Sequence, residues 1–361
     1  MQHLQKKNDR KSCPSGTNSV ILELPIENYL LKETMKTHLK LIAGVALAAI
    51  SSASAQENTT KPVGFRTEKI KAGVFNLISA ELTEAVSAAG TSTAVSATGL
   101  TDDAADFATT LAGTETWVVQ ITSGAASGTV IEAVVDGANG LTSPDFAAAG
   151  VAAGDTYEVR AAKTLSDIFG PANEAGLTAG TTETADIIWV PNGDGTFTRY
   201  YQKLGGLGGN GWRSLSSPTV DEANAPIVYS DAFFVQSRGA DIDIVIVGHV
   251  QTRPATVGLI QGFNFVSRIA PVGQTLATTG LLPTLAGGAV VDADLVWVPD
   301  GAGGYTRYYS KIGGLGGDGW RSLSSPVTDA SNTPLTSGII IQRKGAATNA
   351  TVGVPAFYAD L

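Results

Sequence analysis

Residues 189–218 read WVPNGDGTFTRYYQKLGGLGGNGWRSLSSP, and residues 297–326 read WVPDGAGGYTRYYSKIGGLGGDGWRSLSSP. Twenty-three of the thirty aligned positions are identical, and the two stretches are 108 residues apart throughout. Identity of this extent at a fixed spacing indicates an internal duplication, in which both copies form the same supersecondary unit.

Weaker likeness extends to both sides of the duplicated stretch. The matching pieces are Phe75–Ser79 with Phe263–Ser267, Ala185-Asp186 with Ala293-Asp294, and Val235-Gln236 with Ile341-Gln342. Each unit therefore begins with an F-N-hydrophobic-hydrophobic-S strand. We expect a first repeat unit over residues 56–250 and a second over residues 251–361.

The duplicated stretch predicts a β-hairpin. Ile187 to Val190 and Thr196 to Lys203 have strand composition, and residues 191–195 between them are rich in the Gly, Asn and Asp that hairpin turns require. On the second strand Arg199 falls on one face and Tyr200 on the other, because side chains alternate along a strand.

The first unit is longer because it contains an insert at about 87–160. Three stretches of the insert have strand character, at 116–121, 130–135 and 156–160, and glycine-rich turns separate them. A single helical turn is predicted at 166–169, with Ser166 as its N-cap and Gly170 as its stop. The expected fold class is all-β: two tandem antiparallel β-sandwich or barrel-like repeat units, the first carrying a small inserted β-meander or barrel.

The N-terminal 55 residues read as a leader rather than as part of the fold. From Met35 a short basic start precedes an apolar run, Leu41 to Ile50, and small residues end at Ala55. This order predicts a signal peptide over 35–55, cleaved after Ala55. Residues 1–34 are interpreted as an over-extended start, the alternative being a cytoplasmic extension before an uncleaved anchor. The apolar run is too short to span a bilayer.

Composition excludes several functions. The chain has a formal net charge of −9, and residues 56–361 hold 17 basic and 29 acidic side chains. Such a surface repels phosphate backbones, which disfavours nucleic-acid binding. The one cysteine, Cys13, precedes Ala55, and His249 is the only histidine after it. A thiol nucleophile and a histidine-rich zinc site are therefore excluded, and we expect no cofactor and no metal.

Several short motifs together resemble a known family. They are Val63-Gly64-Phe65, Asn76-Leu77-Ile78-Ser79, Ile121-Thr122-Ser123-Gly124-Ala125, Gly154 to Val159, Thr164-Leu165, Phe169-Gly170, Ala185-Asp186, Tyr200-Tyr201 and Gly211-Trp212-Arg213. They resemble an uncharacterised family of secreted proteins that occurs as many paralogues in Verrucomicrobia-type bacteria. The resemblance implies an exported envelope or extracellular protein and no catalytic or binding residues. This chain departs from that family in carrying the Tyr-Tyr and Gly-Trp-Arg elements twice.

One group of residues is a candidate ligand-binding surface, because aromatic faces stack on sugar rings and arginine binds hydroxyl or acidic groups. The residues are Tyr200, Tyr201, Trp212, Arg213, Tyr308, Tyr309, Trp320 and Arg321. The alternative is that the Trp-Arg pairs pack beneath the glycine-rich stretches 205–211 and 313–319. For those stretches a backbone role with positive φ is favoured over a phosphate cradle, because no helix follows them. A hairpin turn is likewise favoured over calcium at 192–195.

Three hypotheses about function follow. The first is an exported, non-catalytic structural or surface protein of the cell envelope, periplasmic or extracellular. The second is a module that binds carbohydrate or another ligand through the duplicated Trp/Tyr/Arg surface. The third is a glycoside-type hydrolase, which requires two carboxylates converging on a cleft. The sequence does not identify a partner; glycans and other envelope components are the candidates, and an integral membrane protein is not expected after cleavage.

Overall fold

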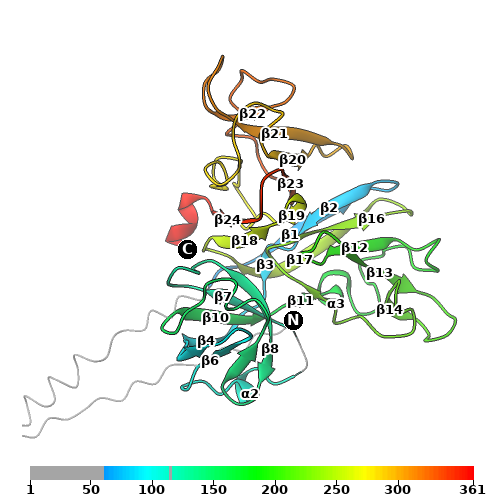
Figure 1. The fold of residues 1–361 in the computed structure, drawn as a ribbon. Helices are drawn as coiled ribbons and strands as arrows, with labels where there is room; N and C mark the ends of the chain where they lie inside the picture. The colour runs from blue at the N-terminus through cyan, green and yellow to red at the C-terminus, as the bar shows by residue number, and fades with distance from the viewer. Residues whose placement is uncertain (1–60, 114–115) are drawn as a thin grey trace, which may run out of the picture. The chain divides into compact units, whose positions relative to one another are not determined.

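A computed structural model describes residues 61–113 and 116–361 of the chain (Figure 1). The predicted signal peptide and the 1–34 extension lie outside the described residues. The all-β prediction is confirmed: antiparallel sheets account for the regular structure, apart from two short α-helices and one 3-10 turn. Among the described residues, none of the helices has the length and apolarity that crossing a bilayer requires.

The two copies of the duplicated stretch lie in two separate five-stranded sheets. The first-copy sheet has the order β14-β13-β12-β16-β2, with β2 (Phe75–Ser79), β12 (Ile187–Pro191), β13 (Phe197–Lys203), β14 (Gly211–Ser214) and β16 (Ala232–Gln236). The second-copy sheet has the order β22-β21-β20-β23-β19, with β19 (Gly262–Val266), β20 (Leu295–Pro299), β21 (Tyr305–Lys311), β22 (Gly319–Ser322) and β23 (Ile339–Arg343). Corresponding sequence segments occupy corresponding places in the two sheets.

Strand register is also the same in both sheets. Trp189 pairs with Arg199 across the first hairpin, and Trp297 pairs with Arg307 across the second. The shared register follows from the shared turn, because turn type and loop length fix which residues face each other in a hairpin.

A small ribbon covers one face of each five-stranded sheet. In the first copy it consists of β1 (Val63–Ile70), β17 (Ile242–Val250) and β3 (Leu82–Thr83), and in the second of β18 (Ala255–Leu259) and β24 (Thr348–Val352). Ile244 and Ile246 of β17 join Trp212 in one hydrophobic core, and Val257 of β18 joins Trp320 in another. Each core therefore lies between a ribbon and a sheet, as in a β-sandwich.

The insert forms its own seven-stranded sheet, in the order β4-β10-β7-β8-β9-β6-β5. Its strands are β4 (Val86–Thr91), β5 (Ala94–Val95), β6 (Gly99–Thr101), β7 (Trp117–Ile121), β8 (Val130–Asp136), β9 (Gly140–Thr142) and β10 (Thr156–Ala161), with α2 (Phe107–Thr110) between β6 and β7. Its core contains Phe107, Phe146 and Tyr157. The insert also contacts the second copy, because the backbone N–H of Thr256 donates to Gly128 O at 2.7 Å.

The predicted helix exists, but its predicted cap was wrong. The helix α3 (Leu165–Phe169) follows the two-residue strand β11 (Lys163–Thr164), which pairs with β15 (Pro226–Ile227). Thr164, rather than Ser166, is the N-cap, because its hydroxyl accepts from Asp167 N at 3.2 Å while the Asp167 carboxylate accepts from Thr164 N at 2.8 Å. This reciprocal capping box satisfies two N–H groups at once. A 3-10 turn, η1 (Ala356–Asp360), ends the chain.

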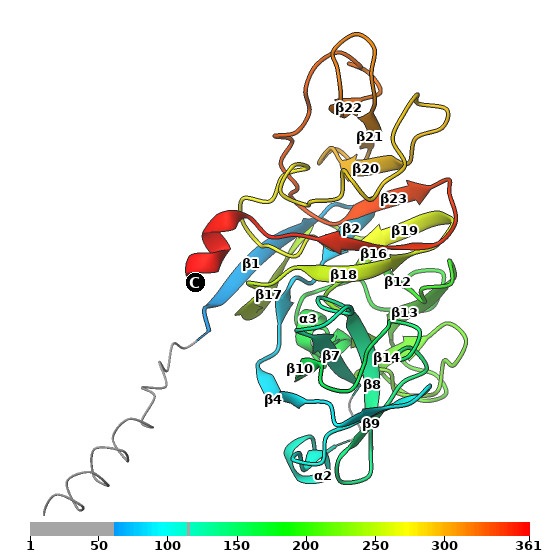
Figure 2. The ribbon, with the colours of Figure 1, turned by 60° about the vertical axis from the view of Figure 1, so that its left-hand side comes forward.

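The two copies are joined where β2 and β19 lie near each other (Figures 1 and 2). A buried ion network crosses this junction. The Glu81 carboxylate accepts from Arg66 Nη1 at 2.9 Å and from Arg268 Nη2 at 2.8 Å. Arg66 lies on β1 of the first copy, whereas Arg268 follows β19 of the second. Burial, opposed by the Glu81 charge, lowers the pKa of Arg66 to about 10.

Candidate functional site

Both tryptophans of the predicted binding surface are buried. Trp212 is 0% exposed and Trp320 is 1% exposed. The Trp212 indole packs against Phe169, with 5.7 Å between ring centroids, and its Nε1 donates to Gly170 O at 2.9 Å. Neither ring presents a face on which a sugar can stack.

The paired tyrosines lie on opposite faces of their strands, and each tyrosine side chain is buried or partly buried. Tyr200 and Tyr308 point into the two sandwich cores, where Tyr308 is partly buried. Tyr201 and Tyr309 are buried on the other face, in small clusters with Ile187 and Leu295 respectively. The structure thus brings the predicted residues together within each copy, but as packing residues rather than as an exposed surface.

Arg213 and Arg321 hold the glycine loops, which we define as residues 205–211 and 313–319. Arg213 Nη2 donates to Gly208 O at 2.7 Å and to Asn210 O at 3.1 Å, and its Nη1 donates to Trp212 O at 2.7 Å. Arg321 donates to the corresponding carbonyls of the second loop. Each buried guanidinium therefore satisfies carbonyl groups that a loop without secondary structure leaves unpaired.

Lysines complete this arrangement. Lys203 Nζ donates to Pro218 O at 2.8 Å and also to Leu207 O, and Lys311 makes the equivalent bonds to Pro326 O and Leu315 O. The predicted positive φ angles are confirmed at Gly205, Gly206, Gly208, Gly209 and Gly211 and at Gly313, Gly314, Gly316, Gly317 and Gly319. The Trp-Arg pair, the lysine and the glycines thus build the same loop in both copies.

An exposed aromatic surface was missed by the sequence analysis. On the outer face of the first-copy sheet, the Trp189 ring packs edge-on against Phe75 at 5.7 Å, and the Arg199 guanidinium lies over Trp189 at 5.1 Å from its centroid. The second copy repeats this group: Phe263 lies 6.0 Å from Trp297, and Arg307 lies 5.2 Å from it. We call each group a Phe–Trp–Arg cluster.

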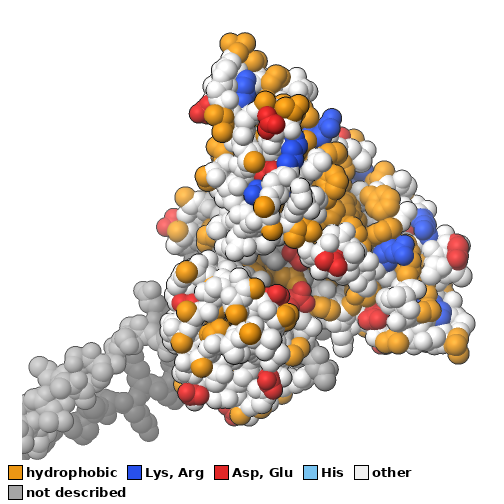
Figure 3. Space-filling model, in the orientation of Figure 1, with side chains coloured by type: hydrophobic (Ala, Val, Ile, Leu, Met, Phe, Trp, Pro, Cys, Tyr) orange, Lys and Arg blue, Asp and Glu red, His pale blue; other side chains and the backbone are white. Residues whose placement is uncertain are grey.

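Both clusters are accessible to a ligand. Phe75 and Phe263 are each 47% exposed, and both arginines are exposed. Among the described residues, neither Arg199 nor Arg307 makes a side-chain hydrogen bond or an ion pair. Figure 3 shows hydrophobic side chains gathered where β2, β16 and β20 lie, with Lys and Arg side chains beside them. A cation–π contact positions each guanidinium over its tryptophan ring, and its N–H donors make no hydrogen bond within the described part of the chain.

The signal for these clusters was present in the sequence. The turn at residues 191–195 places Trp189 opposite Arg199, and both residues recur at the same offset in the second copy. The predicted site contained the adjacent Trp-Arg pairs instead, and their side chains are buried.

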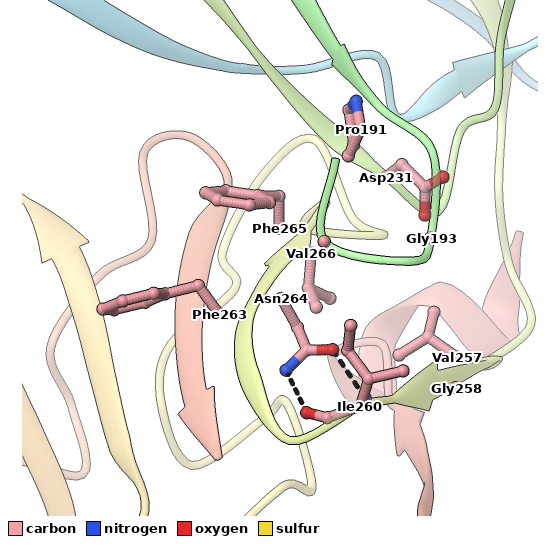
Figure 4. Close-up of a pocket in the computed structure, with 11 residues that line it drawn as sticks. Pro191, Gly193, Asp231, Val257, Gly258, Ile260, Phe263, Asn264, Phe265 and Val266 are labelled. Atoms are coloured by element: carbon pink, nitrogen blue, oxygen red, sulfur yellow. Dashed lines mark hydrogen bonds between the residues drawn. The ribbon is translucent and has the colours of Figure 1, made fainter. Parts of the chain in front are cut away.

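Two equivalent pockets lie where the copies meet. The first is bounded by the first-copy turn, at Pro191 and Gly193, and by Phe263 to Val266 of the second copy (Figure 4). The second is bounded by the second-copy turn, at Pro299 and Gly301, and by Phe75 to Ile78 of the first copy. Each copy therefore places its hairpin turn against the F-N strand of the other.

An asparagine that both F-N strands share, Asn76 in the first copy and Asn264 in the second, lines each pocket. Asn264 Oδ1 accepts from Ile260 N at 2.8 Å and its Nδ2 donates to Ile260 O at 2.9 Å, as the dashed lines in Figure 4 show. Asn76 makes the same pair of bonds to Lys71, at 2.9 and 3.0 Å. These amides are occupied by backbone groups and have a structural role.

Carboxylates do not pair in either pocket. Asp231 lines the first and Glu68 lines the second. Burial and, secondarily, the charge of Glu132 raise the pKa of Asp231 to about 7. Hydrolysis of a glycosidic bond requires a second carboxylate on the other side of the bond. The carboxylates Asp186 and Asp294 are bound by backbone N–H groups such as those of Thr178 and Ala286.

The turn at 192–195 is closed by side chains rather than arranged around a cation. Asp194 Oδ1 accepts from Thr196 N at 2.8 Å, and Asp300 Oδ1 accepts from Ala302 N at 2.7 Å. Within residues 61–113 and 116–361, no three His, Cys, Asp or Glu side chains are arranged to hold a metal ion.

Comparison with family models, curated proteins and solved structures found no match to this chain.

Proposed function

We propose that this chain is an exported, non-catalytic structural or surface protein of the cell envelope. The observation that carries the proposal is that polar side chains of the duplicated stretch bind the carbonyls of a loop instead of lining a cavity. In both copies the adjacent Trp-Arg pair of the stretch is buried, and its arginine, together with the lysine before the glycines, holds the carbonyls of an exposed loop. A catalytic site instead directs such polar groups into a cavity that a substrate enters.

The positions of the carboxylates in the pockets and of the histidine support the same proposal. Asp231 and Glu68 are single carboxylates in separate pockets, and His249 has no counterpart in the other copy. These groups do not form a nucleophile with a base or an acid with a base. The two copies share the loop, the hairpin register and the reciprocal turns, together with the Phe–Trp–Arg cluster.

Export is tested by expressing the full chain in a bacterial host and sequencing the N-terminus of the exported product. We expect the mature protein to begin at Gln56, because the small residues before it end at Ala55. Protease treatment of intact cells then shows whether the protein reaches the outer surface. An intact Met1 or Met35, or a protein found only in the cytoplasm, would contradict the proposal.

A second candidate function is supported by the Phe–Trp–Arg clusters. They offer two equivalent exposed phenyl rings, each near a guanidinium without an acidic partner among the described residues, which suits a glycan carrying carboxylate groups. The test is a glycan array with residues 56–361, the R199A/R307A variant and an R253A control. This candidate requires binding to acidic glycans that R199A/R307A loses and R253A keeps; equal binding by all three proteins would refute it.

A further inference from the structure

The two Phe–Trp–Arg clusters belong to one continuous aromatic surface. In the first copy the Phe197 ring lies 6.0 Å from Trp189, and it also lies 5.0 Å from Phe265 of the second copy. Phe265 and Phe263 are alternate residues of β19, and Figure 4 shows both rings pointing to the same side. Phe263 in turn lies 6.0 Å from Trp297 of its own cluster. Ring contacts therefore run from one cluster to the other across the junction.

The surface is short enough for one extended ligand to reach both clusters. Alternate side chains on a strand are about 7 Å apart, so these ring contacts limit the separation of the two indole rings to about 24 Å. Arg199 and Arg307 lie over the indoles, at the two ends of the surface. Phe234 widens the middle, because it lies 5.3 Å from Phe265 and 6.1 Å from Phe75. We call this surface the aromatic platform, which comprises Trp189, Phe197, Phe234, Phe265, Phe263 and Trp297.

The platform is open to a ligand. Phe263 is exposed, and the other five rings are half-buried. Each half-buried ring packs against a neighbouring ring, so it is already ordered and loses little conformational entropy when a ligand binds. A contiguous apolar surface of this kind is typical of an interaction site.

Charge distinguishes the two five-stranded sheets from the rest of the chain. Their ten strands contain seven Lys or Arg residues and no Asp or Glu, whereas residues 56–361 as a whole hold 29 acidic and 17 basic side chains. Four of the seven cations hold the glycine loops, and Arg343 pairs with Asp294. The other two are Arg199 and Arg307, whose side chains bind no described residue except the tryptophan beneath them. A ligand with negative charges at two separated points therefore complements the platform.

We propose that the two clusters form one site, which binds a single acidic glycan chain across the junction. An acidic sugar accepts hydrogen bonds from each arginine, and neutral sugars stack their apolar faces on the rings between them. This inference rests on the second candidate function, acidic-glycan binding, and specifies its ligand. Because uncharged rings separate the two arginines, the ligand is a chain in which acidic sugars alternate with neutral ones. A nucleic acid carries a charge on every unit, and the net negative charge of the protein repels it.

The joint use of both clusters has a measurable consequence. Once a glycan chain reaches both arginines, its second contact is intramolecular, and the high effective concentration of the second acidic sugar raises the overall affinity about 100-fold or more. Independent clusters would instead bind one glycan each, with an affinity that does not depend on the length of the glycan.

The test is isothermal titration calorimetry of residues 56–361 with hyaluronan oligosaccharides of increasing length, because hyaluronan alternates a uronic acid with a neutral N-acetylated sugar. We expect each protein molecule to bind two short oligosaccharides but only one long oligosaccharide. The long oligosaccharide should bind about 100-fold more tightly than the short one. Length dependence and stoichiometry are measured on the wild-type chain, so they do not depend on the folding of any variant.

Variants then locate the site. R199A and R307A should each lower the affinity for the long oligosaccharide to that for the short one, since one contact remains. R253A is the matched control, because Arg253 is exposed and lies outside the platform; it should bind like the wild type. Circular dichroism melts should be unchanged in all three, because the replaced side chains are exposed.

The outcomes separate this inference from the function on which it rests. Equal affinities for short and long oligosaccharides, or two long oligosaccharides per protein molecule, would overturn the single site and leave acidic-glycan binding by separate clusters. No binding of hyaluronan at any length would overturn the assigned ligand, and the glycan array then shows whether the clusters bind other acidic glycans. A single-stranded oligonucleotide of matched length that binds more tightly than hyaluronan would assign the platform to nucleic acids and overturn the proposal.

Discussion

Replacing Gly208 with alanine should destabilise the protein more than replacing its neighbour Gly209. Both glycines have positive φ, at 89° and 69°. A Cβ on Gly208 would lie 2.7 Å from Thr219 Cα, whereas a Cβ on Gly209 would meet no heavy atom within 4 Å. The two positions thus share the backbone conformation and differ in the space available.

The expected losses in the free energy of unfolding follow from the backbone conformation and from the space available to the methyl group. A left-handed conformation costs alanine about 1 to 2 kcal/mol relative to glycine, and this cost applies at both positions. At Gly208 the methyl group must also displace backbone near Thr219, and overpacking of this kind costs about 1 to 3 kcal/mol more. The second copy offers an independent repeat of the comparison, because a Cβ on Gly316 would lie 2.8 Å from Val327 Cα, while Gly317 is open.

The assay is urea unfolding of residues 56–361, followed by tryptophan fluorescence, for G208A, G209A, G316A and G317A. We expect the free energy of unfolding to fall by about 2 to 5 kcal/mol for G208A and G316A and by about 1 to 2 kcal/mol for the other two. G209N should lie close to the wild type, since asparagine tolerates the left-handed region. Equal losses for G208A and G209A, or no loss for either, would refute the steric account of the loop.

Three further predictions concern the junction, the first pocket and the insert. E81Q should lower the free energy of unfolding by about 3 to 5 kcal/mol in urea titrations, because buried Arg268 would lose the carboxylate that it binds and Arg66 would keep only Glu68; D292N, at an exposed carboxylate, is the control. Asp231, with its pKa raised from 3.8 to about 7, keeps in the folded state a proton that the unfolded chain releases. Its contribution to stability is therefore complete below about pH 4 and is lost as the pH rises through 7, so the difference in unfolding free energy between wild type and D231N should change across that range; a constant difference would contradict the shift. Replacing residues 87–160 with a short Gly-Ser linker should leave a cooperative thermal melt in circular dichroism, because the insert has its own core and Val86 pairs with Arg160 at its base; loss of the melt would show that the remainder depends on the insert.

The sequence predicted the fold class and the hairpins because those features depend on local patterns. Period-two alternation and the PNGDG turn are local patterns, so they predict the two strands of the hairpin without knowledge of distant contacts. The helix cap was misplaced by two residues because Thr164 and Ser166 are both good N-caps, and only the position of Asp167 separates them.

The assignment of faces was harder to predict. In β13 both faces carry aromatic side chains, with Tyr200 on one and Phe197 on the other, so hydrophobicity alone does not identify the core side. The contact that decides it is Trp212 against Phe169, which joins residues 43 positions apart. The exposure of Phe75 and Phe263 was equally hard to predict, because a phenylalanine in a strand is usually buried.

The reciprocal placement of the hairpin turns has an evolutionary consequence. Each copy gives its partner the same turn that it receives, which is the relation between the subunits of a symmetric dimer. We expect two chains that each contain one copy alone to pair as the two copies do here. Fusion keeps the effective concentration of the partner high, so that a weakened contact is tolerated. Fusion also allows the two halves to differ in sequence. The first half has Asp231 at the position where the second half has Ser337, whereas a homodimer would carry the same residue in both subunits.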